Sequence, residues 1–338
     1  MKEPKIIELT KEYLEKMKSL NVLVIGDTII DEYYFTDPKG RTIKDPILSV
    51  DYVRHERYPG GALAIANHIS NFVKNVRLVT VLGDKKRNED FIIKKLNKNI
   101  SAKFFTKKGA FTTIKIRFID NVRDEKLFKI EFITDNPIGH ELEKNVIKYL
   151  SKELPKYDIV IVGDFGHGFI NDGIVKVLEK SSKHLCADVQ TNSANMGFNY
   201  FIKYRKPDYI VLNETELRLG MHSRFEPIKN IIQKINKTNS YKKCLITLGR
   251  RGALYLKNGR IYEAPALTQS TVDTVGAGDA VFAITSLLDY TNVEAGLMPI
   301  YANCIGAIAV SYMGNEKSIT KADLLKTLEK IKLLNLMI

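Results

Sequence analysis

A single aspartate follows a glycine-rich turn in residues 271–283, TVDTVGAGDAVFA. Gly276 and Gly278 would let the backbone turn tightly and approach a ligand where a Cβ atom would collide. The residues from Ala277 onward, AGDAVFAITSLL, are apolar on nearly every face, which predicts a helix buried inside a domain. The first N–H groups of such a helix lack partners within it and carry the positive end of its dipole, so they can hold a phosphate or a developing oxyanion.

Asp279 stands among these amides, where a carboxylate would repel a phosphate. Its position makes sense if it receives a proton from a hydroxyl that attacks the phosphate, which is the work of a general base. A Gly-x-Gly turn is also common as a plain loop, and an aspartate in a first helical turn is a favourable partner of the dipole. The GAGD segment alone therefore leaves both interpretations open.

Apolar strand patterns ending in polar residues recur along the chain. Residues 21–27, NVLVIGD, predict a buried parallel strand whose carboxyl end meets a ligand site, and Asp31 follows four residues later. Similar strands end near Asp164, Asp188 and Asn213, and helical patterns separate them. The alternation of strand and helix predicts an α/β fold, and 338 residues are enough for one large domain.

Two segments interrupt this alternation. Residues from about 33 to 58 are polar and strand-like, and residues 101–134 show a period of two, as in FTTIKIRFID. Together they predict a small, mostly antiparallel sheet that acts as a lid, whose apolar face needs a substrate or a second copy of the chain to cover it. Lys115 and Arg117 share the opposite face, where they would meet a substrate phosphate or face solvent.

Composition narrows the class of partner. The net charge is +13, but lysines and arginines are spread along the chain, which favours an anionic small molecule over nucleic acid. Cys186, Cys244 and Cys304 lie far apart in apolar runs, as expected of reduced core residues in a cytoplasmic protein. The first 20 residues contain neither a signal sequence nor a membrane span and suit a short amphipathic helix on the core. We therefore expect no membrane partner.

The segment DTVGAGDAVFA resembles the C-terminal signature of the ribokinase-like (PfkB) carbohydrate kinases, and the resemblance runs from about residue 22 to 320 with motifs in the expected order. It implies a three-layer α/β core with a mostly parallel sheet and a small β-sheet lid, forming one kinase domain over residues 1–338. By this resemblance Asp279 is the catalytic base, and the amides of Gly276, Ala277, Gly278 and Asp279 form the anion hole.

The same resemblance assigns the sugar side of the site. It implies that Asp31 binds sugar hydroxyls, that Gly60 and Gly61 let the backbone close on the sugar, and that the segments of Asp164 and Asp188 lie beneath it. In this family the lid closes over the sugar and often forms the dimer contact, so we expect a homodimer. The sequence departs from the pattern of heptose kinases at Ala64, where asparagine is usual, and at Val189 and Gln190, where Pro-Lys is usual.

Other segments resemble the family's nucleotide side. The pair Asn213 and Glu216 matches a motif that organises Mg²⁺ and phosphates through water, although NETE also fits a plain helix start with acidic residues in its first turn. Thr247, Gly249 and Gly252 would lie against the ribose and phosphates of ATP, and Asn303 would border the adenine.

Within the family, the segments DEYYFTDPKGRTIKDPILSV and TIKIRFID are most similar to heptose 7-phosphate kinases. The resemblance thus implies phosphoryl transfer from Mg²⁺–ATP to C1 of D-glycero-D-manno-heptose 7-phosphate, in lipopolysaccharide or capsule biosynthesis. A kinase for another sugar or a nucleoside, and a non-catalytic sugar-phosphate sensor, remain alternatives. The chain has no GxxxxGK[ST] loop, and VGAGDAV lacks the third glycine of a dinucleotide fingerprint. A P-loop kinase and a dehydrogenase are therefore set aside.

Overall fold

A long mixed sheet forms the centre of the molecule. The structure is a computed structural model that describes residues 5–193, 195–238, 241–267 and 271–333. Its main sheet has the strand order β12-β11-β10-β9-β8-β7-β1-β3-β4. The strands are β1 (Asn21–Arg41), β3 (Asn75–Lys85), β4 (Ile100–Phe111), β7 (Ile159–Asp164), β8 (Leu185–Val189), β9 (Tyr209–Asn213), β10 (Lys243–Thr247), β11 (Ala253–Lys257) and β12 (Arg260–Ala264). Pairing is parallel from β4 through β10, and β11 and β12 add an antiparallel edge.

Helices cover both faces of this sheet. One core cluster joins it to α1 (Lys5–Met17), α2 (Ala62–Ser70), α8 (Ala277–Tyr290), α9 (Met298–Ala309) and α10 (Lys321–Leu333). A second cluster joins the other face to α4 (His140–Glu153), α5 (Asp172–Ser181), α6 (Glu214–Gly220) and α7 (Ile228–Thr238), while α3 (Glu89–Lys95) follows β3. In β1 the side chains alternate between the clusters, with Val24 in the first and Ile25 in the second. Burial on both faces explains the unbroken apolar run of this parallel strand, and the predicted α/β core is confirmed.

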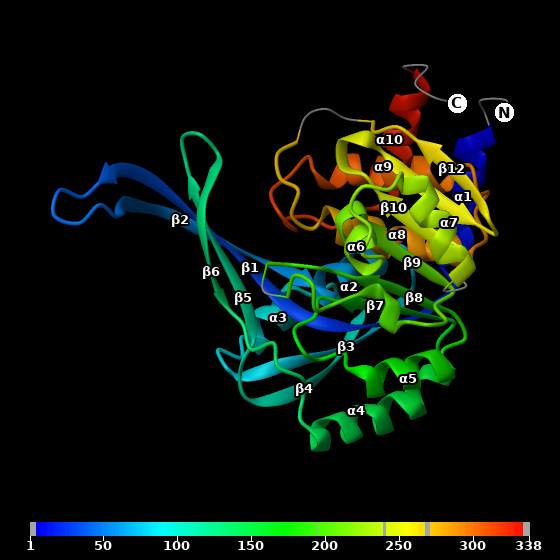
Figure 1. Ribbon diagram of the computed structural model, residues 1–338, viewed down its shortest axis with the longest axis horizontal. Coiled ribbons are helices and arrows are strands. Elements are labelled where there is room, and N and C mark those ends of the chain that lie inside the picture. Colours follow the sequence, from blue (N-terminus) through cyan, green and yellow to red (C-terminus); the bar gives the residue numbers. More distant parts are fainter. Residues whose placement is uncertain (1–4, 194, 239–240, 268–270, 334–338) are drawn as a thin grey trace.

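A smaller sheet extends from the body as the lid. After Asp27, β1 leaves the main sheet, pairs antiparallel with β2 (Leu48–Gly61) from Thr28 and pairs parallel with β5 (Thr113–Asp120) from Ile29. The strand β6 (Glu125–Phe132) completes this sheet by antiparallel pairing with β5. Figure 1 shows the hairpins β1–β2 and β5–β6 reaching away from the helical layers.

The structure corrects the predicted extent of the lid. We expected residues 101–134 to belong to it, but β4 (Ile100–Phe111) pairs with β3 in the main sheet, so only the β5–β6 part of that range lies in the lid. Ile100, Ala102 and Phe104 pack on the core cluster of the α1 face. A half-buried edge strand shows the same period of two as a lid strand, so the pattern alone could not tell the two sheets apart.

Two other expectations are met in the described residues. Residues 5–17 form the amphipathic helix α1, which buries Ile6 and Met17 in the core, and Cys186, Cys244 and Cys304 are buried with free thiols. Across the described ranges we find no helix whose length and apolar character would let it span a bilayer.

Candidate active site

A cleft of about 290 Å³ opens where the carboxyl ends of the main strands meet the lid. Its walls come from three sources: the lid strands β1, β2 and β5, the segments after β7, β8 and β9, and the turn that begins α8. The lining residues include Asp31, Gly61, Lys115, Arg117, Asp188, Gln190, Asn213, Glu216, Thr247, Thr274, Gly276, Gly278 and Asp279. Residues predicted from widely separated motifs therefore meet in one cavity.

The turn before α8 has the geometry that its glycines suggested. Gly276 is the N-cap of the helix and adopts φ +81°, a left-handed conformation that favours glycine, and a Cβ there would collide with the side chain of Asn315. Around Gly278 an added Cβ would meet no atom of the described residues within 4 Å. Since Gly278 lies in the first turn of a 14-residue helix and lines the cleft, the amides here are well placed for an anionic ligand.

Asp279 lines the cleft and is only 7% exposed. Gln190 donates a hydrogen bond from Nε2 to Asp279 Oδ1 at 2.7 Å. Burial raises the pKa of Asp279 to about 7, even though the Gln190 hydrogen bond acts to lower it. A carboxyl group with a pKa near neutrality can accept a proton and release it again at physiological pH, as a general base requires.

Three more polar side chains surround this carboxylate. The same Gln190 nitrogen also donates to Asp188 Oδ2 at 2.8 Å, so one amide bridges two carboxylates. Burial, followed by the nearby Glu216, raises the pKa of Asp188 well above its usual range. Burial likewise raises the pKa of Glu216 to about 7, although N–H groups of Asn213 and Thr191 donate to its carboxylate. Such a concentration of buried carboxyl groups is a mark of functional sites and attracts cations.

The NETE segment is both a helix start and part of the cleft lining. Asn213 is the N-cap of α6, and its Oδ1 accepts from the Glu216 N–H at 2.9 Å while Glu216 Oε2 accepts from the Asn213 N–H at 2.8 Å. This reciprocal arrangement is a capping box. Both residues also line the cleft, so the helix start itself presents the Glu216 carboxylate to it.

The lid contributes charged side chains to the other wall. Arg117 donates from one guanidinium nitrogen to Asp31 Oδ1 at 2.5 Å, and Asp31 is 4% exposed. A Cβ on Gly60 would collide with the Asp31 carboxylate, and one on Gly61, at φ +58°, would collide with the backbone near Asp27. The glycine pair therefore allows the close approach of β2 to the cleft. Lys115 and Arg117 face this cleft, so the alternative of a solvated strand face is wrong for them.

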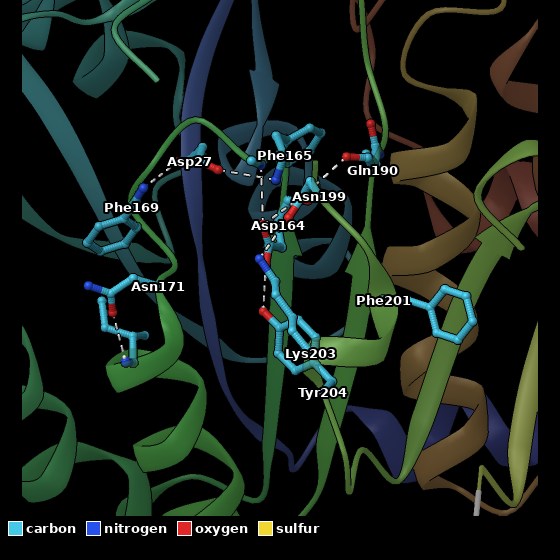
Figure 2. A network of polar contacts seen from close by, with 12 residues as sticks. Asp27, Asp164, Phe165, Phe169, Asn171, Gln190, Asn199, Phe201, Lys203 and Tyr204 are labelled. Atoms are coloured by element: carbon cyan, nitrogen blue, oxygen red, sulfur yellow. Dashed lines mark hydrogen bonds and ion pairs between the residues drawn. The ribbon is translucent and has the colours of Figure 1, made fainter. Parts of the chain in front are cut away.

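Asp164 itself does not line the cleft, although the next residue, Phe165, does. Asp164 is fully buried, pairs with Lys203 at 2.6 Å and accepts from the Tyr204 hydroxyl at 2.8 Å. Figure 2 shows this network beneath the loop that follows β7, with Asp27 holding the amides of that loop. A carboxylate already saturated by protein donors cannot reach a sugar, so Asp164 supports the loop from behind.

A second cavity of about 270 Å³ adjoins the first and shares Thr247, Thr274 and Gly278 with it. Its lining is mostly apolar and includes the predicted Ala277, Gly249, Gly252 and Asn303. Gly252 adopts φ +97°, and a Cβ there would collide with the backbone of Ala264. Asn303 donates from Nδ2 to the carbonyls of Ala264 and Pro265, each at 2.9 Å, so it fixes the cavity rim as well as lining it.

Sequence reasoning missed two features of the site. The first is the hydrogen bond from Gln190 to Asp279, two residues that lie 89 positions apart in the sequence. The sequence showed Gln190 only as a departure from a motif. Ala64 was also seen as a departure from the heptose-kinase pattern, but it lines a separate cavity of about 120 Å³ beside Asn315 and does not line the cleft. A glutamine just past a strand end, at the same sheet edge as the GAGD turn, was the available signal for the first feature.

The profile of the "pfkB family carbohydrate kinase" family matches residues 19–322. The chain therefore belongs to the PfkB family of carbohydrate kinases. It is 26% identical over 303 residues to the bifunctional protein HldE of Helicobacter pylori (strain Shi470), a match that covers 87% of this chain and 63% of that protein. The chain thus spans less than two thirds of the length of this relative.

Solved structures show the same fold. Phosphofructokinase-2 from Escherichia coli, in complex with potassium, superposes with a TM-score of 0.74 at 15% identity over 93% of this chain and 99% of that one. Arabidopsis thaliana ribokinase, complexed with ribose and ATP, gives a TM-score of 0.68 at 16% identity over 92% and 99% of the chains. The predicted ribokinase-like architecture is confirmed by these similarities.

Proposed function

We propose that this carbohydrate kinase transfers a phosphoryl group from Mg²⁺–ATP to a sugar hydroxyl bound in the cleft, with Asp279 as general base. The observation that carries the proposal is the place of Asp279, a buried carboxyl group of pKa about 7 next to Gly278, which lines both cavities. A hydroxyl in the cleft would give its proton to Asp279, while the amides of Gly276, Ala277, Gly278 and Asp279 would stabilise charge on the transferred group.

ATP would occupy the second cavity, with its adenosine against Gly249, Gly252 and Asn303 and its phosphates directed past Thr247 to the turn. Within the described residues no group of three or more His, Cys, Asp or Glu side chains could hold a metal ion by itself. This fits Mg²⁺, which keeps several waters and binds through substrate phosphates and one or two carboxylates. Glu216 would then hold the ion through water. The free buried thiols fit the reducing cytoplasm as the place of reaction.

Our candidate for the sugar is D-glycero-D-manno-heptose 7-phosphate, phosphorylated at C1. The similarity to HldE supports it, and so does Lys115, an 8%-exposed ammonium group that lines the cleft. Among the described residues no carboxylate lies within 4.0 Å of Lys115 to form an ion pair. A buried cation of this kind would be compensated by an anionic substrate group, and the 7-phosphate offers one.

We also propose that two chains associate through the outer face of the lid. Phe128 and Ile130 on β6 are 44% and 46% exposed, and the Phe118 and Phe128 rings stack at 4.4 Å there. Apolar side chains exposed together on a sheet face favour coverage by a second surface. Sugar-phosphate sensing without turnover is the second candidate function, favoured only by the departure at Val189, because Ala64 lies outside the cleft.

Phosphorus NMR tests the proposed chemistry. The protein is incubated with Mg²⁺–ATP and heptose 7-phosphate, free hexoses, pentoses or nucleosides, beside the variant Asp279→Asn. We expect a new sugar 1-phosphate signal from the heptose, and a rate at least about a hundredfold lower in the variant, the lower range for a general base, with ATP affinity retained. Reaction of another sugar alone would overturn the heptose assignment. ATP binding without any turnover would favour the sensor.

A further inference from the structure

One buried carboxylate, Asp273, connects the lid to the turn before α8. It is 3% exposed and accepts hydrogen bonds from the Tyr33 hydroxyl at 2.9 Å, the Val275 N–H at 3.2 Å and the Gly314 N–H at 3.1 Å. Lys126 adds an ion pair at 2.5 Å. Tyr33 and Lys126 belong to the lid, whereas the Val275 amide belongs to the turn that leads into the Gly276 N-cap.

Lys126 reaches Asp273 because β6 contains an irregularity. Phe118 pairs with Phe128, but the next residue of β5, Ile119, pairs with Lys126, so Leu127 is the extra residue. A bulge of this kind re-aims the neighbouring side chain. It places Lys126 opposite Ile119, whose side chain packs with Tyr33 and Met313 at the contact between the lid and the body. The irregularity therefore points an ammonium group, instead of a leucine, at the base of the catalytic turn.

The ion pair joins a buried carboxylate, Asp273, to a partly exposed ammonium group, Lys126. The Asp273 side chain is only 1% exposed, whereas the Lys126 side chain is 43% exposed. Although burial opposes it, the hydrogen bond and charge of Lys126 lower the pKa of Asp273. A buried carboxylate that loses its cation must find other donors or shift its position. The donors that remain for Asp273 are the Val275 and Gly314 amides that already bond to it. Loss of Lys126 would therefore shift the carboxylate against these amides and disturb the turn.

We propose that Lys126 is a positioning residue that couples the lid to the anion-binding turn through Asp273. Lys126 holds a positive charge against Asp273, which fixes the Val275 amide and with it the entry to α8. A sugar that holds the lid in this place would thereby keep in position the amides that meet the transferred phosphoryl group. This inference rests on the proposed roles of Asp279 and the turn, and it adds a residue that no sequence motif marked.

Two lysine variants separate this role from general stability. Lys126→Met removes the charge but keeps most of the side-chain volume, and Lys126→Arg keeps the charge. Lys39→Met is the matched control, because Lys39 is also a half-exposed lid lysine but pairs with Asp51 within the lid hairpin at 2.9 Å. The readouts are kcat and KM with Mg²⁺–ATP and heptose 7-phosphate, ATP affinity with and without the sugar, and hydrogen exchange of residues 274–279 in the protein alone.

We expect Lys126→Met to lower kcat about tenfold, less than the loss of an oxyanion-hole donor outright, and to leave the affinity for ATP in the absence of sugar unchanged. The gain in ATP affinity on adding sugar should shrink, and amides 274–279 should exchange several-fold faster. Lys126→Arg should restore most of each value, and Lys39→Met should match the wild type.

Unchanged kcat and unchanged exchange in Lys126→Met would overturn the inference while leaving the kinase proposal intact. Equal losses in Lys126→Met and Lys39→Met would also overturn it, because they would indicate a general weakening of the lid. Should the wild-type protein phosphorylate no sugar of the panel, the proposed function would fail, and the exchange measurement alone would still decide whether Lys126 orders the turn.

Discussion

At the scale of single residues, the site depends on how Asp279 is held. Its carboxyl group has one oxygen engaged by Gln190, and Gln190 is fixed in turn by Asp188. The proposed base is thus oriented before substrate arrives, and the hydrogen bond favours its ionised form.

This arrangement predicts a pH effect of Gln190→Met. Removal of the hydrogen bond leaves burial opposed only by the charge of Lys115 and raises the pKa of Asp279 further above about 7. A hydrogen bond to a charged group is worth about 1.5–3 kcal/mol, or about one to two pKa units. Because the base must be ionised to act, we expect the acidic limb of kcat/KM to move up by about one to two pH units, so the loss is large at pH 6.5 and small at pH 9.

The control for this change is Gln233→Met, which removes the same amide from a site where Gln233 donates to the Gly259 carbonyl. Its pH profile should match that of the wild type. If the acidic limb of Gln190→Met stays in place, Gln190 does not contact the base in the working enzyme.

At the scale of elements, α6 shows how a local structural motif can present a functional group. The capping box fixes Glu216 by two backbone interactions, and as a result the acidic side chain is buried, with Glu216 only 6% exposed. Its folded-state pKa of about 7 exceeds the ordinary value of 4.5. The folded state therefore favours the protonated form, and the stability that Glu216 contributes is fully present below pH 4.5 and is lost as pH rises through about 7.

Glu216→Gln tests this linkage. The amide carbonyl can still accept from Asn213, but the group no longer titrates, so we expect the variant to gain stability relative to the wild type between pH 5 and 8. The raised pKa corresponds to at most about 3 kcal/mol at pH 8. Thermal unfolding without nucleotide, measured every half pH unit, gives this difference. The proposed ion-binding role adds that Mg²⁺ should stabilise the wild type more than the variant.

The control is Glu263→Gln, which neutralises a carboxylate whose side chain is 61% exposed in a pair with Lys229. For that variant the difference in unfolding temperature should stay flat with pH. A flat difference for Glu216→Gln as well would mean that the carboxylate is not held in a low-dielectric site.

Local elements were predictable from the sequence, and contacts between elements were not. The turn at Gly276 and the start of α8 follow from backbone conformation and helix-end chemistry, both of which are encoded within a few residues. The contacts Gln190–Asp279 and Lys126–Asp273 join segments 89 and 147 positions apart and depend on how the sheets meet. Asp164 is a further example. The sequence pattern of an aspartate at a strand end is the same whether its side chain faces a ligand or, as here, accepts from Tyr204.

At the scale of the whole molecule, the continuous strand β1 joins the two sheets. Its first residues pair with β3 and β7 in the main sheet, and the residues from Ile29 onward pair with β5 in the lid. The sequence suggested two separate segments, because the apolar run stops near residue 27 and polar residues follow. One strand that serves both sheets fixes Asp31 at their junction, so the lid wall of the cleft and the main sheet share a rigid element.

The proposed dimer follows from the two faces of the lid. The inner face carries Lys115 and Arg117 toward the cleft, and the outer face carries Phe128 and Ile130 toward solvent. We expect light scattering at micromolar concentration to give the mass of two chains. Introducing a charge by Ile130→Asp should give a monomer, because a buried carboxylate without a partner opposes association.

Phe225→Asp is the matched control for Ile130→Asp, since Phe225 is 86% exposed but lies outside the lid, in the segment between α6 and α7. That variant should remain a dimer. A monomer mass for the wild type, or a dimer mass for Ile130→Asp, would contradict association through this face. The outer face lies behind the strand that holds Lys115 and Arg117. Loss of the dimer should therefore raise the KM for the sugar more than the KM for ATP. Such a result would connect dimer formation with the cleft and not with the second cavity.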